Sequence, residues 1–155
     1  MAGRSKFNVN TSKKAKDKRT LNGYIFDSDI EYKFYVYLLS QQEEGLVKNI
    51  TVQPKFLLQE AYKKYDKNIR KIEYIADFEI EYSNGETIIY DVKGMVMPDF
   101  KLKRKIFDYK YPDKVLRCIN WSRLDGGWVD IEIIEKGRKE RKKAKNSSKP
   151  QIKIY

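Results

Sequence analysis

The stretch that decides the fold is Ile72–Lys93, IEYIADFEIEYSNGETIIYDVK, in which two strand-forming segments flank the turn residues 83–85. β-Branched and aromatic residues around such a turn predict a β-hairpin. Successive side chains of a strand point to opposite faces. One face of the first strand therefore carries Ile72, Tyr74, Ala76, Phe78, Ile80 and Tyr82. Asp77 lies on the other face, and in the second strand Asp91 and Lys93 share a face.

The length of the turn decides whether Asp77 and Asp91 meet. A two-residue loop, Asn84-Gly85, would put the two aspartates on opposite faces, because a one-residue slip of register flips every side chain. A three-residue loop, 83–85, closed by glycine in the left-handed conformation, places Asp77 directly opposite Asp91. We favour this loop because it also gathers apolar side chains of both strands on one face. Those side chains are Phe78, Ile80, Tyr90 and Val92.

Two carboxylates side by side on a sheet indicate a metal site. Like charges directly opposite one another are destabilising, and a hard divalent cation would neutralise them. Mg²⁺ is typically held by one or two carboxylates together with substrate phosphates. Lys93 would then lie beside the ion, where it could orient or deprotonate a water or stabilise phosphate charge. The hairpin alone leaves an alternative open, a solvated strand face that carries acidic residues and one lysine.

The composition excludes several classes of protein. A chain of 155 residues predicts one domain with a real core. It contains no histidine, which excludes histidine-dependent triads and zinc–histidine sites. The single Cys118, expected to be buried, excludes an intramolecular disulfide and indicates a reducing, cytoplasmic setting. No apolar run approaches the length of a membrane span, so no membrane partner is expected.

The positive charge is concentrated at the two ends of the chain. The formal net charge is +11, of which residues 1–20 carry +6 and residues 136–155 carry +8, so residues 21–135 carry −3. We predict a flexible basic arm over 1–20, a folded domain over 21–135 and a basic C-terminal tail over 136–155. Basic tails suit a polyanion such as DNA, because neutralising phosphates releases counterions. Tails that only solubilise the chain, or are merely disordered, are the alternative.

A helix is predicted between Ser28, a typical N-cap residue, and Gly45, a typical stop. Its apolar stripe consists of Ile30, Phe34, Tyr37 and Leu38. Glu31 lies at the edge of that stripe and allows two interpretations. The spacing from Ser28 to Glu31 is that of a capping box. The same carboxylate could instead be presented to a metal beside the sheet.

The segment before the hairpin predicts a strand over Val47–Gln53, broken by Pro54 and continued over Phe56–Leu58. Residues 59–71 are polar and basic and predict a loop or hairpin tip near the substrate. The last two predicted strands are Val115–Ile119 and Val129–Ile134. Trp121 and Trp128 flank the turn between them and are expected to pack there.

A second helix is predicted from a cap at Asp99 to about Lys110. Its expected buried residues are Leu102, Ile106 and Tyr109, with Phe107 at the margin. Basic side chains surround the rest of the helix, and they either lie on a solvated face or contact the DNA backbone. They are Lys101, Lys103, Arg104 and Lys105.

The order of these elements resembles the PD-(D/E)XK nuclease superfamily. It runs from a helix with Glu31, through a strand with Asp77, to a strand with Asp91-Val92-Lys93 and a further helix. The fuller pattern is FDSDIEYKFYVYL, TVQPKF, YIADFEIEY, YDVKG and FKLKRKIFDYKYP. It looks like small phage-encoded endonucleases of that superfamily, which resemble Holliday-junction resolvases, and it covers about Gly23–Pro112. The chain departs from the superfamily at Ala76, where a proline is usual, and at Asp91, where many relatives have glutamate.

The resemblance implies an α/β fold with a restriction-endonuclease-like core, a central mixed β-sheet flanked by helices. Asp77 and Asp91 would bind Mg²⁺ or Mn²⁺ with help from the Val92 carbonyl. Glu31 would complete the site directly or through water, and Lys93 would position the attacking water. Gln53 is either a support for the site or an ordinary polar residue at a strand end.

The function implied is that of a metal-dependent DNA endonuclease that cuts branched DNA in the manner of a Holliday-junction resolvase. A resolvase cuts two strands symmetrically, so a homodimer is expected. The setting would be the cytoplasm of a bacterial host of a phage or prophage. Two alternatives stay open, a nuclease of the same fold acting on linear duplex or single-stranded DNA, and a noncatalytic DNA-binding module. The acidic cluster of Glu31, Asp77 and Asp91 argues against a noncatalytic binding module, because its negative charge would repel phosphate.

Overall fold

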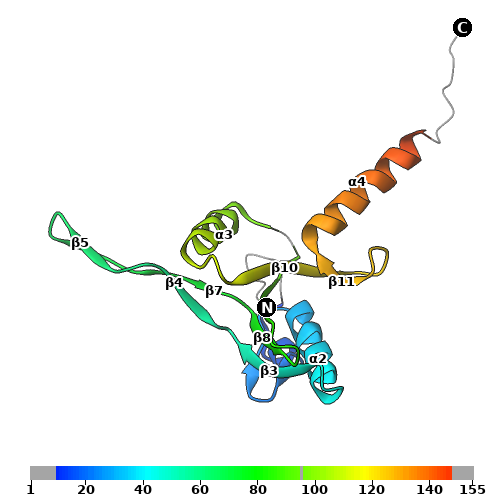
Figure 1. Ribbon diagram of the computed structural model, residues 1–155, viewed down its shortest axis with the longest axis horizontal. Helices are drawn as coiled ribbons and strands as arrows, with labels where there is room; N and C mark the ends of the chain where they lie inside the picture. Colours follow the sequence, from blue (N-terminus) through cyan, green and yellow to red (C-terminus); the bar gives the residue numbers. More distant parts are fainter. Residues whose placement is uncertain (1–9, 95, 148–155) are drawn as a thin grey trace, which may run out of the picture.

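A five-stranded mixed β-sheet lies at the centre of the α/β fold, with helices on both of its faces, as expected from the sequence (Figure 1). The computed structural model describes residues 10–94 and 96–147. The sheet order is β11 (Gly127–Asp130), β10 (Val115–Ser122), β9 (Thr87–Val92), β8 (Phe78–Tyr82) and β3 (Val47–Val52). Strands β9 and β10 run parallel, whereas the other neighbours in the sheet are antiparallel.

The predicted register of the central hairpin is confirmed. Phe78 pairs with Tyr90, and the Tyr82 amide donates a hydrogen bond to the Glu86 carbonyl at 2.8 Å. Gly85 closes the three-residue loop with φ +90°, which glycine adopts at no steric cost. Beyond the Phe78–Tyr90 pair, the Asp77 amide donates to the Tyr90 carbonyl at 3.1 Å, so Asp77 lies beside the end of β9 that carries Asp91.

The expected single strand over residues 72–82 is wrong, because the backbone bends at Ala76 and Asp77. Residues before the bend form β7 (Ile72–Ile75), which pairs with β4 (Lys55–Gln59) outside the central sheet. The partner strand bends at the same level, since the Gln53 amide donates to the Asp77 carbonyl at 2.9 Å and the Ala76 amide donates to the Pro54 carbonyl at 3.1 Å. Gln53 has φ +52°, and Pro54 has no amide to donate to a ladder. Both strands thus leave the sheet together.

The bend divides the hairpin's apolar side chains between two cores. Phe78, Ile80, Tyr90 and Val92 pack against α2 (Asp29–Glu43). Tyr74 and Ala76, predicted to share a face with Phe78, instead pack with Ile89 against α3 (Pro98–Lys110) on the other side of the sheet. Cys118 is buried in this second core, as expected.

The two helices differ in how well their buried faces were predicted. Helix α2 begins after Ser28 and ends before Gly45 as expected, but Tyr35 is its buried tyrosine and Tyr37 is 40% exposed. Helix α3 begins at Pro98, and Met97 occupies the N-cap position without a side-chain hydrogen bond. Asp99 therefore lies in the first turn and is not the cap. Its buried residues are Phe100 and Phe107, whereas Leu102 and Tyr109, expected inside, are 62% and 89% exposed.

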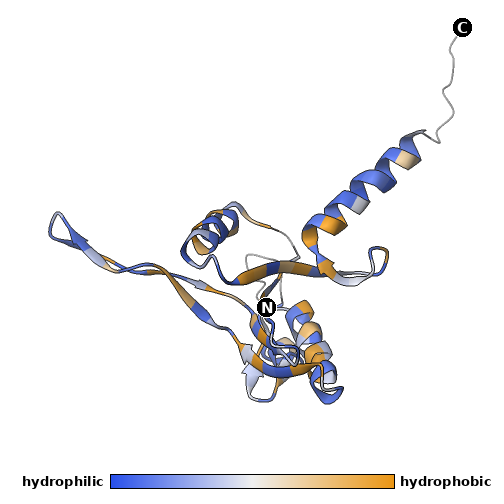
Figure 2. Ribbon diagram, viewed as in Figure 1, coloured by the Kyte–Doolittle hydropathy of each residue, from blue (hydrophilic) through white to orange (hydrophobic). Residues whose placement is uncertain are grey.

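The two ends of the chain contain more regular structure than predicted. Residues 10–20 of the expected flexible arm include α1 (Lys13–Asp17) and β1 (Thr20–Leu21), which pairs with β2 (Tyr24–Ile25), and Arg19 is buried. The strand expected to reach Ile134 ends at Asp130, and α4 (Ile131–Ser147) follows it. Helix α4 projects from the body and is mostly hydrophilic beyond its first turns (Figure 2). The rest of both predicted tails, residues 1–9 and 148–155, lies outside the described residues.

A long β-ribbon also projects from the body (Figure 1). It continues from β4 and β7 into β5 (Tyr62–Lys64) and β6 (Lys67–Ile69), which form the hairpin tip expected within residues 59–71. The expected packing of Trp121 on Trp128 is confirmed, with ring centroids 5.5 Å apart. None of the described helices is long and apolar enough to cross a membrane.

Candidate active site

The bend between β7 and β8 brings Asp77 to the end of β9, beside Asp91 and Lys93. The Val92 amide donates a hydrogen bond to Asp77 Oδ2 at 2.6 Å, which fixes that carboxylate against the neighbouring strand. Asp91 is 1% exposed, and Lys93 Nζ lies 2.5 Å from Asp91 Oδ1. The three side chains that the sequence singled out on the hairpin are therefore neighbours.

Tyr74 is a member of the site that sequence reasoning missed. Its hydroxyl donates a hydrogen bond to Asp91 Oδ2. Burial, followed by the charge of Asp91, raises the pKa of Tyr74, so the phenol stays protonated and acts as a donor. In an unbroken strand Tyr74 would lie on the face away from Asp77, and only the bend turns it toward Asp91. No signal in the local sequence pattern indicates that contact.

The carboxylates of the site repel one another. Burial raises the pKa of Asp77 well above its ordinary value, and the charges of Asp91 and Glu31 raise it further, while the Val92 hydrogen bond opposes the shift. Burial alone would lower the pKa of Lys93, but the adjacent Asp91 carboxylate outweighs it and the pKa is raised. Lys93 is thus held as an ammonium ion. That state suits orientation of water or stabilisation of phosphate charge better than deprotonation of water.

The structure shows Glu31 in the capping role, one of the two interpretations that the sequence left open, and the metal role stays a prediction. At the start of α2 its amide donates to Ser28 Oγ at 3.3 Å, and the Ser28 hydroxyl donates to Glu31 Oε1 at 2.6 Å. The Asp27 amide donates to Glu31 Oε2 at 3.2 Å, so the carboxylate caps the helix. Burial raises the pKa of Glu31, and its charge in turn acts on Asp77. The capping carboxylate therefore lies within electrostatic reach of Asp77 and Lys93.

The oxygen atoms of this site suit a hard divalent cation. Asp91 Oδ1 is buried, and its close partner among the described residues is the Lys93 ammonium, 2.5 Å away. No group of three or more His, Cys, Asp or Glu side chains among the described residues is arranged to hold an ion. Mg²⁺ needs only one or two protein carboxylates when water and phosphate supply its other ligands. Asp77 and Asp91 fit that requirement. Val92 contributes its amide to the site, and a ligand role for its carbonyl stays a prediction.

Two other predicted contributors lie around this cluster. Gln53 is exposed, and its contact with the site is the hydrogen bond that its backbone amide donates to the Asp77 carbonyl. On α3, Lys101 and Lys105 are exposed, whereas Lys103 and Arg104 are partly buried. The Arg104 guanidinium donates to the Leu116 carbonyl at 3.4 Å and lies 3.9 Å from Asp108. Lys101 and Lys105 are thus better placed for a DNA backbone contact than Arg104.

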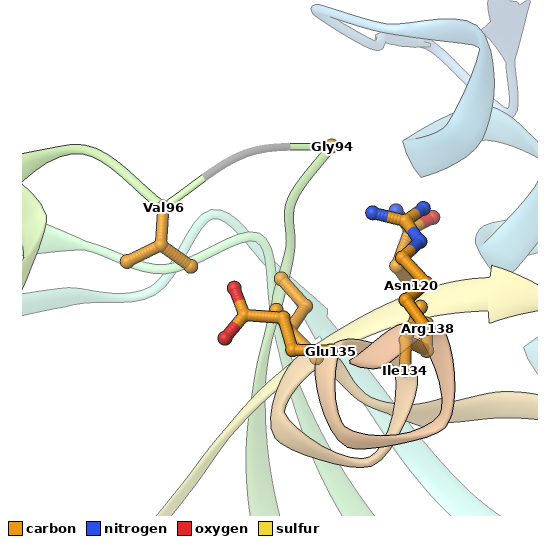
Figure 3. Close-up of a pocket in the computed structure, with 7 residues that line it drawn as sticks. Gly94, Val96, Asn120, Ile134, Glu135 and Arg138 are labelled. Atoms are coloured by element: carbon orange, nitrogen blue, oxygen red, sulfur yellow. The ribbon is translucent and has the colours of Figure 1, made fainter. Parts of the chain in front are cut away.

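A small polar pocket of about 140 Å³ adjoins the site where the chain leaves Lys93 (Figure 3). Glu135 and Arg138 extend from α4 toward the loop that carries Gly94 and Val96. The remaining lining residues are Asn120, Ile131 and Ile134. The sequence did not predict this pocket, because residues 129–134 were expected to form a strand and residues from 136 onward a tail.

Comparison with known proteins adds a family but no activity. A family model described as "Protein of unknown function (DUF1064)" matches residues 11–123, which include all the side chains of the hairpin site and the projecting ribbon. No curated protein and no solved structure matches the chain.

Proposed function

The chain belongs to the DUF1064 family, and we propose that it is a metal-dependent endonuclease that hydrolyses DNA phosphodiesters. The observation that carries the proposal is the pair of carboxylates on neighbouring strands. Asp77 is hydrogen-bonded to the Val92 amide, next to Asp91, and the Lys93 ammonium lies 2.5 Å from Asp91. Two carboxylates and one retained positive charge suit metal-assisted phosphodiester hydrolysis, because they can hold a cation and stabilise charge on the phosphate.

Each side chain has a role that follows from its contacts. A bound Mg²⁺ or Mn²⁺ would act as a Lewis acid on the phosphate and lower the pKa of a coordinated water. Asp77, fixed by the Val92 amide, and Asp91, fixed by the Tyr74 hydroxyl, would bind the cation. Lys93 would orient the attacking water or donate to a phosphate oxygen, and Glu31 would hold a further water. Hydrolysis adds the oxygen of water to phosphorus and breaks one phosphodiester bond.

Branched DNA is the substrate that we propose first. The support is the resemblance of the Glu31, Asp77 and Asp91-x-Lys93 arrangement to the PD-(D/E)XK superfamily and its resolvase-like phage endonucleases. The restriction-endonuclease-like core and the homodimer belong to the same proposal. The basic charge of the whole chain, +11, favours a nucleic-acid substrate.

The test is cleavage of an end-labelled four-way junction and a matched linear duplex in Mg²⁺, with the wild-type protein and Asp91→Ala. We expect paired, symmetric nicks in the junction that are absent with Asp91→Ala. Asp113→Ala, which removes an exposed carboxylate from a turn, is the matched control and should cut normally. Equal cutting of both substrates would support the nuclease activity but contradict a preference for branched DNA. DNA binding without any cutting would overturn the proposal in favour of a noncatalytic binding module.

A further inference from the structure

The projecting ribbon, residues 55–75 and called here the arm, is one continuous antiparallel hairpin. Its outer part keeps a single register, in which Gln59 pairs with Ile72, Tyr62 with Ile69 and Lys64 with Lys67. One strand of ten residues, 55–64, spans roughly 33 Å at 3.3 Å per residue. Figure 1 shows the arm extending away from the central sheet, so its end lies well beyond both cores.

The base of the arm is anchored and its tip is not. Phe56 and Tyr74 are buried against α3, and the Phe56 and Phe107 ring centroids lie 5.1 Å apart. The Tyr111 hydroxyl donates to the Leu57 carbonyl at 2.9 Å. In contrast, every residue of the tip, 60–71, is exposed except Ile69, which is partly buried. A two-stranded hairpin without other partners is only marginally stable in water, so the tip adds little to the stability of the body.

The charges of the tip favour an anionic partner. It holds five basic residues, Lys63, Lys64, Lys67, Arg70 and Lys71, against Glu60 and Asp66. Lys64 faces Lys67 directly across the two strands, which is a destabilising like-charge pair. Lys63 pairs with Asp66 at 3.3 Å, but no carboxylate of the described residues lies within ion-pair distance of Lys64, Lys67 or Arg70. Phosphates would neutralise these unpaired cations.

The turn at the end of the tip carries backbone strain. Tyr65 and Asp66 both adopt left-handed conformations, with φ +49° and +57°. Turns of this kind favour Asn-Gly, because a tyrosine side chain is crowded at positive φ. Tyr65 is nevertheless 86% exposed, and Lys64 Nζ lies 5.3 Å from the centre of its ring. Strain together with an exposed aromatic side chain at the outermost point indicates a contact with a partner.

We propose that the tip of the arm lies in the major groove of duplex DNA that flanks the cleaved phosphate, an inference that rests on the proposed nuclease function. A two-stranded ribbon fits the major groove of undistorted duplex, about 12 Å wide, whereas entry into the minor groove, about 6 Å wide, requires that groove to be widened. Lys64, Lys67 and Arg70 would contact phosphates along the groove walls, and Tyr65 would reach the base edges. The substrate must then carry intact duplex beside the cut.

The position of the arm relative to the site is set by the chain itself. Strand β7 ends at Ile75, two residues before Asp77, and the hydrogen bond from the Gln53 amide to the Asp77 carbonyl holds the other strand at the same point. DNA held along the arm is therefore aligned with the carboxylates at its base. Two basic tips repel each other, which disfavours an interface made by the tips of two copies.

The test compares the wild-type protein with a variant in which residues 61–70 are replaced by Asn-Gly. The replacement keeps Glu60 opposite Lys71, in the register that pairs Gln59 with Ile72, and closes the shortened arm with a favoured two-residue turn. It removes a net charge of +3. The matched control, Lys33→Ala, Lys110→Ala and Arg123→Ala together, removes the same charge from exposed positions on α2, on α3 and in the turn after β10. Both variants should melt at the wild-type temperature, because neither change touches a core.

The measurement is dimethyl sulfate footprinting of an end-labelled linear duplex at low salt with EDTA, so that nothing is cut. Dimethyl sulfate reports guanine N7 in the major groove and adenine N3 in the minor groove. We expect the wild type and the control to protect a run of guanine N7 atoms that the shortened-arm variant exposes. The affinity of the shortened-arm variant should fall roughly tenfold or more.

Several outcomes would overturn the inference. They are guanine N7 protection that survives the shortening, protection confined to adenine N3, and no protection by the wild-type protein. A shortened-arm variant that loses a dimer in sedimentation but keeps the footprint would assign the arm to a second copy of the chain. Cleavage is scored separately in Mg²⁺. An arm footprint without any cleavage would contradict the proposed nuclease function and support the DNA contact of the arm. Cleavage without an arm footprint would contradict only the DNA contact of the arm.

Discussion

At the scale of single residues, the candidate site is a balance of charges that favours a divalent cation. Glu31, Asp77 and Asp91 bring three negative charges when ionised, and Lys93 brings one positive charge. Burial is the first cause of the raised pKa of Asp77, and the charges of Asp91 and Glu31, part of the remaining −2, raise it further. A divalent cation has the charge needed to offset that excess, which a monovalent cation would only halve.

The raised pKa of Asp77 leads to a prediction about stability and pH. Because the folded-state pKa lies above the unfolded-state pKa, the stability contributed by this group is present below the ordinary carboxyl pKa. It is lost as pH rises through the raised value. Asp77→Asn cannot ionise and still offers an oxygen to the Val92 amide. We therefore expect Asp77→Asn to melt several degrees above the wild type at neutral pH without metal, and the gain to vanish below about pH 4. Thermal melts at both pH values in EDTA measure the difference.

Asp113→Asn is the control for that prediction, since it removes an exposed carboxylate far from the cluster and should leave the melting temperature unchanged. A gain in Asp77→Asn that is equal at both pH values would show that ionisation of Asp77 is not its cause. Mn²⁺ should stabilise the wild type more than the variant, because binding to the folded state raises its stability by mass action.

At the scale of elements, α3 decides how the arm is held. Phe107 is fully buried and packs on Phe56, whereas Tyr109 on the same helix is 89% exposed. Phe107→Ala should lower the free energy of unfolding by about 3–5 kcal/mol, because it leaves a cavity at the base of the arm. Tyr109→Ala should change it by no more than about 0.5 kcal/mol. Urea unfolding of both variants measures the difference, and an equal loss in the two would contradict the helix orientation.

The elements also show what the sequence could and could not predict. The hairpin register follows from the two-residue period of the strands and from Gly85. The sequence could therefore predict that Asp77 and Asp91 come close together. The bend was not, because it depends on hydrogen bonds between Gln53 and Asp77, residues distant in sequence, and the Tyr74 contact depends on the bend. Local periodicity also failed to identify the buried face of α3. Phe100 and Phe107 are the residues that it buries, whereas Leu102 and Tyr109, expected inside, are exposed.

The start of α4 illustrates a different limit of the same reasoning. Isoleucines at 131, 133 and 134 suit a strand as well as a helix, and a short apolar run does not distinguish the two. Tertiary contacts settle the choice, because Ile131 and Ile134 line the same pocket, as residues three apart on a helix do, whereas a strand would point them to opposite faces. The helix also contributes Glu135 and Arg138 to the pocket beside the site, so this error concealed part of the site's surroundings.

At the scale of the whole molecule, the structure consists of a two-core body from which two basic elements project, the arm and α4 (Figures 1 and 2). Helix α4 is tied to the body near its start by Ile134. It is tied again at Arg141, whose guanidinium makes two hydrogen bonds to Asp125 at 2.7 and 3.1 Å. Residues 142–147 are exposed. The segment after Arg141 therefore adds positive charge without a share in either core.

Truncation after Arg141 tests whether that charge serves DNA binding. It removes Lys142, Lys143, Lys145, Lys149 and Lys153 and no acidic residue. The melting temperature should not change, since the Arg141–Asp125 contact is retained. DNA affinity should fall, and the slope of log K against log salt should become shallower by at most about 4.5, because each lost phosphate contact accounts for about 0.9. Fluorescence anisotropy at several salt concentrations measures the slope. An unchanged slope would show that the lysines beyond Arg141 only solubilise the chain, which would leave the arm and the body as the surfaces that contact phosphate.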